Sequence, residues 1–402
     1  MLIFILILAA IDIYAFRMVR QIETLKKYGW AYWVLNGLIY AYFLFRMSSF
    51  GVLPHEVVIY FRAFTIIFFF SKFAFILPLV LDDIRRAVQW FITRFVKKRT
   101  KPVQPESRKR FLKQVSVTLG SAPFLVMGYG VVRNIYRYRV IHQKLKVRNL
   151  HPDLEGLRIV QISDIHSGTF PDQKPVLRGI DMINELNPDV FVFTGDLVND
   201  TADEIDPFVE YFSKIKATYG KYSIMGNHDY GDYHPWRNED EKIQNDLLFE
   251  EKHRQMEWDL LRNEHRQIAV GQSKLNIIGV ENYSTLPRFP RKGDLVEARK
   301  GMEEGDFRLL LSHDPTHWGA EVTTKNTDID LTLSGHTHGF QFGVEIPGII
   351  RWSPAQYIYK EWAGLYQTKN QFLYVNRGYG VLGYPGRIGI LPEITLIELE
   401  NA

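Results

Sequence analysis

Long apolar stretches dominate the first third of this 402-residue chain. They lie at Met1 to Phe16, Trp30 to Phe45, Ala63 to Leu81 and Val115 to Val132. Each approaches the ~17 to 25 residues with which an α-helix crosses the core of a bilayer. A buried core helix or a signal peptide would explain one such stretch, but a series with almost no amphipathic periodicity indicates membrane spans. We therefore predict an all-α transmembrane region of about four helices over residues 1–134.

From Gly156 onward the pattern changes to short β-branched and aromatic runs that end in polar clusters. Such runs predict strands, and apolar residues at helical spacing predict a helix over Val176 to Leu186. The alternation predicts an α/β domain over residues 150–402, after a basic linker at 135–149. Periodicity alone leaves open one wide sheet or two packed sheets. The predicted strands are Leu157 to Ile162, Val190 to Phe193, Tyr222 to Met225, Leu275 to Val280, Leu309 to Leu311, Leu331 to Leu333 and Phe372 to Val375.

Basic residues concentrate beside the apolar stretches, although the formal net charge of the chain is only +4. Lysine and arginine accumulate in short cytoplasmic loops, so the loops after the first and third stretches belong inside the cell. This places the N-terminus and everything after Val132 outside. Basic residues at 133–148 would then lie just outside, which weakens the prediction without reversing it. The third loop carries Arg85, Arg86, Arg94, Lys97, Lys98, Arg99, Lys101, Arg108, Lys109, Arg110 and Lys113.

The segment Ser107 to Lys113 resembles a twin-arginine export signal, with Lys109 in place of the second arginine. An ordinary basic flank is the alternative. If the resemblance holds, it agrees with the charges of the loops in placing the C-terminal domain on the extracytoplasmic side of a cell membrane.

Two ionisable side chains, Asp12 and Lys72, lie inside the apolar stretches, where an unpaired charge is costly. We expect them to pair, or Lys72 to reach the membrane surface, and a proton or substrate path is the alternative. The chain contains no cysteine, which excludes disulfides, thiolate nucleophiles, iron–sulfur clusters and cysteine-bound zinc.

Polar clusters follow five of the predicted strands. Loops at strand ends are where α/β proteins assemble their sites. Carboxylate, amide and imidazole groups together suit Mn, Fe or Zn and match calcium poorly, and so many ligand types imply more than one ion. The clusters are Asp164-Ile165-His166, Gly195-Asp196, Gly226-Asn227-His228-Asp229, Ser312-His313-Asp314 and Gly335-His336-Thr337-His338-Gly339.

In this order, spread from Asp164 to Gly339, the clusters resemble the motifs of the calcineurin-like metallophosphoesterases. The resemblance covers residues 150–402, including the closing stretch from Asn376 to Arg387, and within the family it is closest to membrane-anchored bacterial phosphodiesterases. It implies two packed β-sheets flanked by helices and a site for two divalent metal ions, Mn, Fe or Zn. One ion would be held by Asp164, His166, Asp196 and His338, and the other by Asn227, His313 and His336, with Asp196 bridging both.

The resemblance also implies a phosphoesterase that hydrolyses a phosphodiester, phosphomonoester or pyrophosphate bond. His228 would donate a proton in the transition state, and Asp229 would orient its imidazole. The alternative is a metal-binding scaffold of the same fold without activity, but such scaffolds usually lack ligands that are all present here.

The substrate is expected to carry a lipid or to be held at the bilayer surface, because the predicted spans exceed what anchoring needs. Basic residues 133–148 would contact anionic membrane lipids, and no nucleic acid is expected as a partner. The apolar and aromatic segment Tyr230 to Leu261 suits a lid, with Tyr230 to Trp236 facing the substrate. A helix packed on the core is the alternative for its second half.

Overall fold

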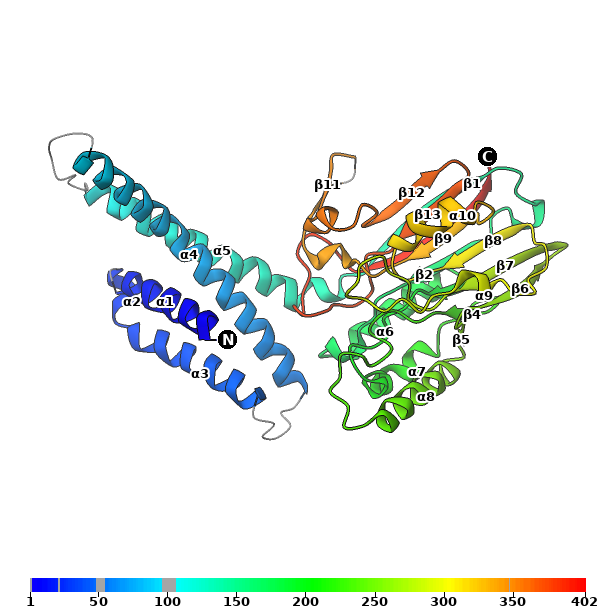
Figure 1. The fold of residues 1–402 in the computed structure, drawn as a ribbon, viewed down its shortest axis with the longest axis horizontal. Helices are drawn as coiled ribbons and strands as arrows, with labels where there is room; N and C mark the ends of the chain where they lie inside the picture. The colour runs from blue at the N-terminus through cyan, green and yellow to red at the C-terminus, as the bar shows by residue number, and fades with distance from the viewer. Residues whose placement is uncertain (1, 21, 48–54, 96–105, 347) are drawn as a thin grey trace. The chain divides into compact units, whose positions relative to one another are not determined.

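The structure is a computed structural model, and it describes residues 1–402 except 1, 21, 48–54, 96–105 and 347 (Figure 1). Chain contacts divide it into two compact units, Met1–Tyr129 and Gly130–Ala402. The predicted basic-loop residues Lys97, Lys98, Arg99 and Lys101 lie outside the described residues.

The first unit is helical. Four long helices among its described residues each contain or overlap one of the predicted apolar stretches, and the short α2 was not predicted. Within the described part of the chain, segments 56–95 and 106–136 are long and apolar enough to cross a membrane, with mean hydropathies of 2.3 and 1.6. The helices are α1 (Leu2–Val19), α2 (Glu23–Lys26), α3 (Gly29–Met47), α4 (His55–Phe95) and α5 (Glu106–Val132).

Asp12 and Lys72 form a buried ion pair, which confirms the expected pairing. The Lys72 ammonium also donates to Asn36 Oδ1 at 2.8 Å. The Asp12 carboxylate, 2% exposed, accepts further hydrogen bonds from the hydroxyls of Tyr32 and Tyr40. This network links α1, α3 and α4 and satisfies the charge of Asp12 within the unit.

The described residues of the second unit form two six-stranded sheets and a separate two-stranded ribbon. The first sheet has the order β1-β14-β2-β3-β4-β5, and the second has the order β12-β13-β9-β8-β7-β6. The strands of the first are β1 (Arg139–Val147), β14 (Glu393–Asn401), β2 (Arg158–Ile162), β3 (Val190–Phe193), β4 (Lys221–Ser223) and β5 (Asp259–Leu260). Those of the second are β12 (Gly364–Thr368), β13 (Gln371–Val375), β9 (Leu331–Ser334), β8 (Phe307–Leu311), β7 (Ser273–Gly279) and β6 (Glu264–Val270). The ribbon pairs β10 (Val344–Ile346) with β11 (Ile350–Trp352).

The two large sheets pack face to face, so the two-sheet alternative is confirmed. Strand β3 shows why, because successive side chains of a strand point to opposite faces. Val190 and Val192 join a core that contains residues of both sheets, whereas Phe191 and Phe193 join a core on the outer face. Continuous apolar runs such as this one therefore predict strands buried on both sides.

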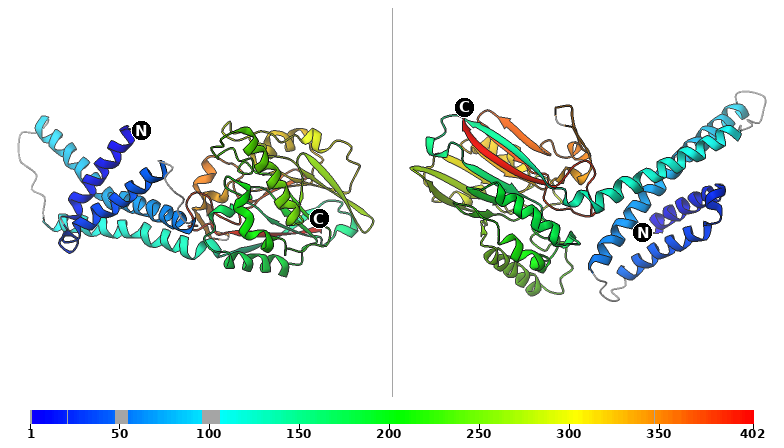
Figure 2. Two further views of the ribbon diagram at one scale, coloured as in Figure 1. Left: turned by 90° about the horizontal axis from the view of Figure 1, so that it is seen from below. Right: turned by 180° about the vertical axis from the view of Figure 1, so that it is seen from behind.

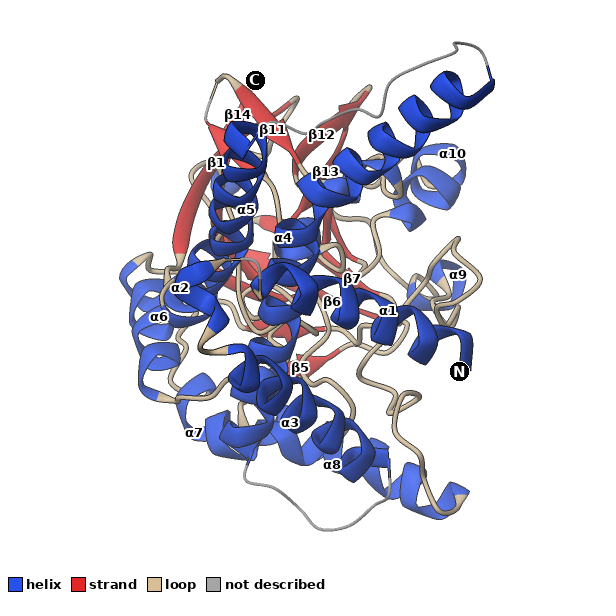
Figure 3. Ribbon diagram, turned by 90° about the vertical axis from the view of Figure 1, so that its left-hand side faces the viewer, coloured by secondary structure: helices blue, strands red, loops and turns tan. Residues whose placement is uncertain are grey.

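Helices cover the outer faces of the sandwich. Apolar side chains of α6 (Lys174–Glu185), α7 (Val209–Phe212) and α8 (Glu239–Gln255) complete the core outside the first sheet. Helix α9 (Leu295–Ala298) contributes to the core outside the second. Figure 3 shows α6 and α7 on one side of the strands and α9 and α10 (Thr323–Lys325) on the other. The second half of the predicted lid segment is thus largely the packed helix α8, as the alternative prediction for it stated.

The linker predicted at 135–149 is wrong, because most of it is strand β1. β1 pairs in parallel with the C-terminal strand β14, from Arg139 opposite Glu393 to Val147 opposite Asn401 (Figure 2). Leu145 and Val147 point into the core between the sheets, and the lysines alternate with them toward solvent. An edge strand with lysines on its exposed face resists pairing with other chains, so the basic residues have a structural reason as well.

Candidate metal centre

The side chains predicted to form the site all follow the C-terminal ends of parallel strands. β2, β3 and β4 run parallel in one sheet, and β8 and β9 run parallel in the other. The loops after these strands meet at one edge of the sandwich, and the predicted ligands are buried there or nearly so. They are Asp164, His166, Asp196, Asn227, His313, His336 and His338.

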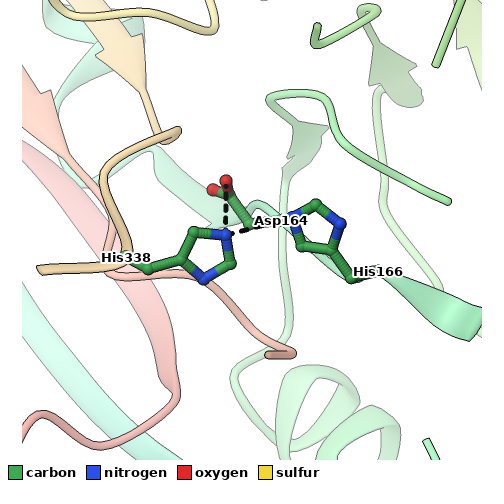
Figure 4. A group of neighbouring side chains, drawn as sticks. All are labelled: Asp164, His166 and His338. Atoms are coloured by element: carbon green, nitrogen blue, oxygen red, sulfur yellow. Dashed lines mark hydrogen bonds and ion pairs between the residues drawn. The ribbon is translucent and has the colours of Figure 1, made fainter. Parts of the chain in front are cut away.

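Two groups of three side chains each bring their ligand atoms within 4.8 Å of one another. The first is Asp164, His166 and His338, whose rings and carboxylate converge in Figure 4. His338 Nε2 lies 3.1 Å from Asp164 Oδ1 and 3.0 Å from His166 Nε2. Three lone-pair donors around one point form a suitable site for a cation.

The second group is Asp196, His313 and His336. Asp196 Oδ2 lies 3.1 Å from His313 Nε2 and 3.6 Å from His166 Nε2, so this carboxylate stands between the two groups. His336 Nδ1 lies 3.3 Å from His313 Nε2.

Asn227 lies beside the site with a buried oxygen that lacks a partner. Its Nδ2 donates to the hydroxyl of Tyr233 at 3.1 Å. Its Oδ1 is buried and accepts no hydrogen bond from any described residue. A buried carbonyl oxygen without a partner is costly, and coordination of a cation would satisfy it.

The backbone of the site is strained. Non-glycine residues seldom take a positive φ, and residues held there concentrate at functional sites. Five of the predicted ligands do so, with φ of 52° at Asp164, 46° at His166, 62° at Asp196, 72° at His336 and 49° at His338. The loops are also tightly packed, because a Cβ on Gly335 would lie 2.3 Å from Asp164 Oδ2.

The electrostatics of the site favour positive charge between its carboxylates. Burial opposes ionisation of Asp164, yet His338 and His313 hold its pKa well below the usual range. Burial likewise opposes ionisation of Asp196, whose pKa His313 and His228 hold low. Burial disfavours a charged His313, but Asp196 raises its pKa to about 10. In His166 burial prevails and lowers the pKa well below its usual value, so this imidazole is a neutral donor.

The role predicted for Asp229 is wrong. Its carboxylate does not face the His228 imidazole but accepts hydrogen bonds from the backbone N–H groups of Gly226, Asp196 and Leu197 at 2.8 Å each. It therefore fastens two of the ligand-bearing loops together. His228 is oriented instead by the carbonyl of Asn199, 2.7 Å from its Nδ1. Proximity in sequence suggested the first pairing, but the turn directs the two side chains apart.

Only part of the predicted substrate-facing segment faces the site. The ring of Tyr233, which is 45% exposed, lies 4.5 Å from that of His228. Tyr230 is buried, and its hydroxyl accepts from the backbone N–H of Asn282 at 2.9 Å. Trp236 donates its indole N–H to the Gly231 carbonyl at 2.7 Å. Tyr233 is thus the residue of this segment that contacts the site.

Sequence reasoning missed several side chains next to His336. The Tyr359 hydroxyl lies 2.9 Å from His336 Nε2, and Phe289 packs edge-on against the same imidazole with ring centroids 4.6 Å apart. The Arg288 guanidinium lies 4.6 Å from the centre of the Phe289 ring. Burial raises the pKa of Tyr359 to about 12, so its hydroxyl keeps its proton. None of these residues belongs to a local motif that could have identified it.

The closing stretch contributes a buried guanidinium behind His338. Arg387 is fully buried and donates to the carbonyls of Arg377 at 2.8 Å and Gly378 at 3.0 Å. Its Nη2 lies 3.5 Å from His338 Nδ1. Burial lowers its pKa to about 10, and its hydrogen bonds to carbonyls hold the loop on which His338 rests.

Two family models match this chain, one over each unit. A model described as probable calcineurin-like phosphoesterase, transmembrane domain, matches residues 1–135, and the calcineurin-like phosphoesterase model matches residues 157–340. An uncharacterized metallophosphoesterase of Bacillus subtilis, YkuE, is 29% identical over 301 residues, which cover 73% of this chain and 98% of that protein. A transmembrane protein with metallophosphoesterase domain of Danio rerio is 31% identical over 283 residues, which cover 68% of this chain and 60% of that protein.

The similarity also extends over both units at once. An uncharacterized metallophosphoesterase of Helicobacter pylori is 26% identical over 410 residues, which cover 98% of this chain and 97% of that protein. The match to the transmembrane model and the metal-capable site therefore lie in one chain here, and the Helicobacter pylori relative aligns with both units. The chain belongs to the calcineurin-like metallophosphoesterases and carries their transmembrane domain.

Proposed function

We propose that the protein is a membrane-anchored phosphoesterase that uses two divalent metal ions to hydrolyse a phosphodiester, phosphomonoester or pyrophosphate bond. The observation that carries this proposal is the position of Asp196. Its carboxylate belongs to one group of ligand atoms and also lies beside His166 of the other. A carboxylate between two dications stabilises both, at the ~3.5 to 4 Å separation of two-metal sites.

The residues fit such a centre. Asp164, His166, Asp196 and His338 would hold one ion, and Asn227, His313 and His336 would hold the other with Asp196. The two groups contain only histidines and carboxylates, so Asn227 belongs to neither of them. Its buried Oδ1, without a hydrogen-bond partner among the described residues, supports its inclusion as a ligand. The donor set suits Mn, Fe or Zn. When bound, the ions would neutralise phosphate oxygens and make a water more nucleophilic at neutral pH.

His228 is the side chain suited to proton transfer. Because the Asn199 carbonyl can only accept, His228 Nδ1 carries the hydrogen of that bond, and Nε2 is the nitrogen that can exchange a proton with substrate. Its imidazole is partly exposed, unlike the fully buried ring of His166. A proton on Nε2 would pass to the leaving oxygen as the phosphorus–oxygen ester bond breaks.

The proposed substrate is a phosphate ester carried by a lipid or held at the bilayer surface. The match to a transmembrane family supports this proposal, because a site tethered to a membrane would work close to it. We further propose a bacterial cell membrane with the catalytic domain on the extracytoplasmic side, supported by the basic residues between the third and fourth spans. A reporter that is active only in the cytoplasm, fused after Ala402, should be inactive. Activity of that reporter would reverse the orientation and leave the chemistry intact.

The central test uses the full-length protein in detergent, stripped of metal and then supplied with Mn, Zn or Fe. Short diesters, short monoesters and lipid-linked pyrophosphates would be offered in turn. We expect hydrolysis of at least one class only after metal is restored. Two bound ions per chain without turnover of any class would instead support the metal-binding scaffold.

A further inference from the structure

One short region of the catalytic domain exposes an unusual number of large apolar side chains. Among the described residues after Arg133, thirteen such side chains are exposed, and eight of them lie between residues 340 and 358. Soluble domains rarely expose so many large apolar side chains in one short region unless it takes part in an interaction. We call these eight residues the apolar face. They are Phe340, Phe342, Val344, Ile346, Ile349, Ile350, Tyr357 and Ile358.

The ribbon β10–β11 explains how the apolar face is presented. Val344 pairs with Trp352 and Ile346 pairs with Ile350, so these four side chains share one side of the ribbon. The intervening pair, Glu345 opposite Arg351, lies on the other side.

That other side is fastened to the domain. Glu345 forms an ion pair with the buried Arg377 at 2.6 Å, and Arg377 also binds the buried Glu393. Arg351 donates to the Ala363 carbonyl at 2.8 Å. The ribbon thus turns its polar side inward and its apolar side outward, which is the reverse of the arrangement expected for an edge in water.

The apolar face is covalently continuous with the metal centre at both ends. It begins at Phe340, just after His338, and the Ser353 hydroxyl donates to the Gly339 carbonyl at 2.7 Å to close the ribbon onto this loop. It ends at Ile358, next to Tyr359, whose hydroxyl lies 2.9 Å from His336 Nε2. A surface that binds the apolar face therefore lies next to the catalytic groups.

A lipid bilayer matches the composition of this surface. The chain carries a transmembrane domain, so a bilayer is always tethered to the catalytic domain. Aromatic side chains such as Tyr357, 75% exposed, and Trp352 favour the interface between lipid tails and headgroups. Lys360, with a 92% exposed side chain, follows the apolar face and can contact anionic headgroups.

We propose that the apolar face inserts shallowly into the bilayer and holds the metal centre at headgroup level, where it would admit a phosphate ester borne by a lipid. The consequence for the substrate rests on the proposed hydrolysis, whereas the docking itself does not. The protein would then contact the membrane in two ways, through its spanning helices and through the apolar face of the catalytic domain, which does not span the bilayer.

The absence of cysteine allows a direct test on the full-length chain. Ile349, 80% exposed, would be replaced by Cys and labelled with a polarity-sensitive fluorophore in vesicles that contain anionic lipid. Val296→Cys is the matched control, because Val296 is 84% exposed on α9, outside the apolar face. Leu125→Cys, 69% exposed in α5, reports a label in a predicted membrane span.

We expect lipid-borne quenchers to quench the label at 349 to an extent that approaches the label at 125, and to leave the label at 296 nearly unaffected. A label at 349 that behaves like the label at 296 would overturn the docking. A label at 349 that is shielded from water but not quenched from the lipid would also overturn it, because a protein partner would then cover the apolar face.

A second variant separates docking from chemistry. Ile346→Ser combined with Ile349→Ser and Ile350→Ser should lower hydrolysis of a lipid-borne ester in vesicles by about 10-fold, while a short soluble ester is hydrolysed as by the parent protein. If the triple variant hydrolyses the lipid-borne ester as fast as the parent protein does, the apolar face does not help a lipid-borne substrate to reach the site. If the variant loses the same activity on both esters, the substitutions have damaged the site. If the parent protein hydrolyses neither ester, the proposed function fails, and the fluorescence test still decides the docking.

Discussion

The two units of this protein both bury carboxylates, but they compensate the charge differently. In the helical unit, Asp12 has a lysine partner, and tyrosine hydroxyls and an asparagine complete the network. In the catalytic unit, Asp164 and Asp196 form ion pairs only with histidines among the residues that the structure describes. The first arrangement is electrostatically complete, whereas the second retains negative charge that a cation would balance.

This difference separates a structural network from a reactive site. A buried pair with good geometry holds elements together and can in principle be replaced by apolar residues of similar volume. A group of carboxylates and imidazoles on a strained backbone has no such replacement, because its role is to bind a cation. Substitutions at the buried charges of each unit can test this contrast.

Replacing Asp196 with Asn should abolish hydrolysis and lower the metal content more than Asp164→Asn does. Asp196 stands between both groups of ligands, so its charge is lost from two sites at once. Metal analysis of the purified variants beside activity assays checks this. If the Asp196 variant keeps two ions and ordinary turnover, the bridging assignment is wrong.

Breaking the ion pair of the helical unit should destabilise that unit while leaving the chemistry of the site intact. Asp12→Leu alone leaves the Lys72 charge buried and should cost about 3 to 5 kcal/mol. Thermal unfolding in detergent measures the loss. The double variant with Lys72→Met should recover most of it, and failure to do so would indicate that the pair has a role beyond structure.

His228→Asn should keep both metals and reduce turnover by about 100-fold or more, as expected when a general acid is lost. The reason is its position: its Nδ1 binds a backbone carbonyl, and its other nitrogen is available for proton exchange. Turnover and metal content should therefore respond separately. Loss of metal in this variant would instead make His228 a ligand.

His253 is a buried titratable group without a charged partner in the described part of the chain, and it should make stability depend on pH. Burial lowers its pKa to about 4, whereas the unfolded chain titrates near ~6.5. As the pH falls below the pKa of the unfolded chain, His253 binds a proton in the unfolded chain but not in the folded chain. At pH ~5 the free energy of unfolding is therefore lower by about 2 kcal/mol than above pH ~7, where the effect is absent. The loss reaches its full size only below the folded pKa of about 4.

His253→Leu should remove this loss, because the imidazole packs between Phe249 and Trp258 and its Nε2 has no hydrogen-bond partner among the described residues. Unfolding of the parent and the variant at pH 7 and pH 5 provides the comparison. His142→Leu on the exposed side of β1 is the control and should leave the pH dependence unchanged. An unchanged slope in the His253 variant would contradict the assignment.

Local sequence was sufficient to predict the elements that carry the chemistry. Each ligand-bearing loop directly follows a strand, so strand prediction and motif order together located Asp164, Asp196 and His338 at one edge of the domain. The apolar stretches likewise predicted the long helices, since crossing a bilayer needs only length and apolar composition. The pairing of Asp12 with Lys72 followed because either charge alone is too costly in such helices.

The remaining features depend on contacts between residues far apart in the chain. Strand β1 is a strand because β14, at the opposite end of the catalytic unit's sequence, supplies its hydrogen bonds, and its lysines alone indicated a membrane flank. Asp229 serves the backbone of the loop that follows β3, which no adjacent motif reveals. The outward apolar side of the β10–β11 ribbon follows from the binding of Glu345 by Arg377 on its inner side. Sequence therefore determined which groups are available for chemistry, whereas tertiary hydrogen bonds and ion pairs decided which way each of them faces.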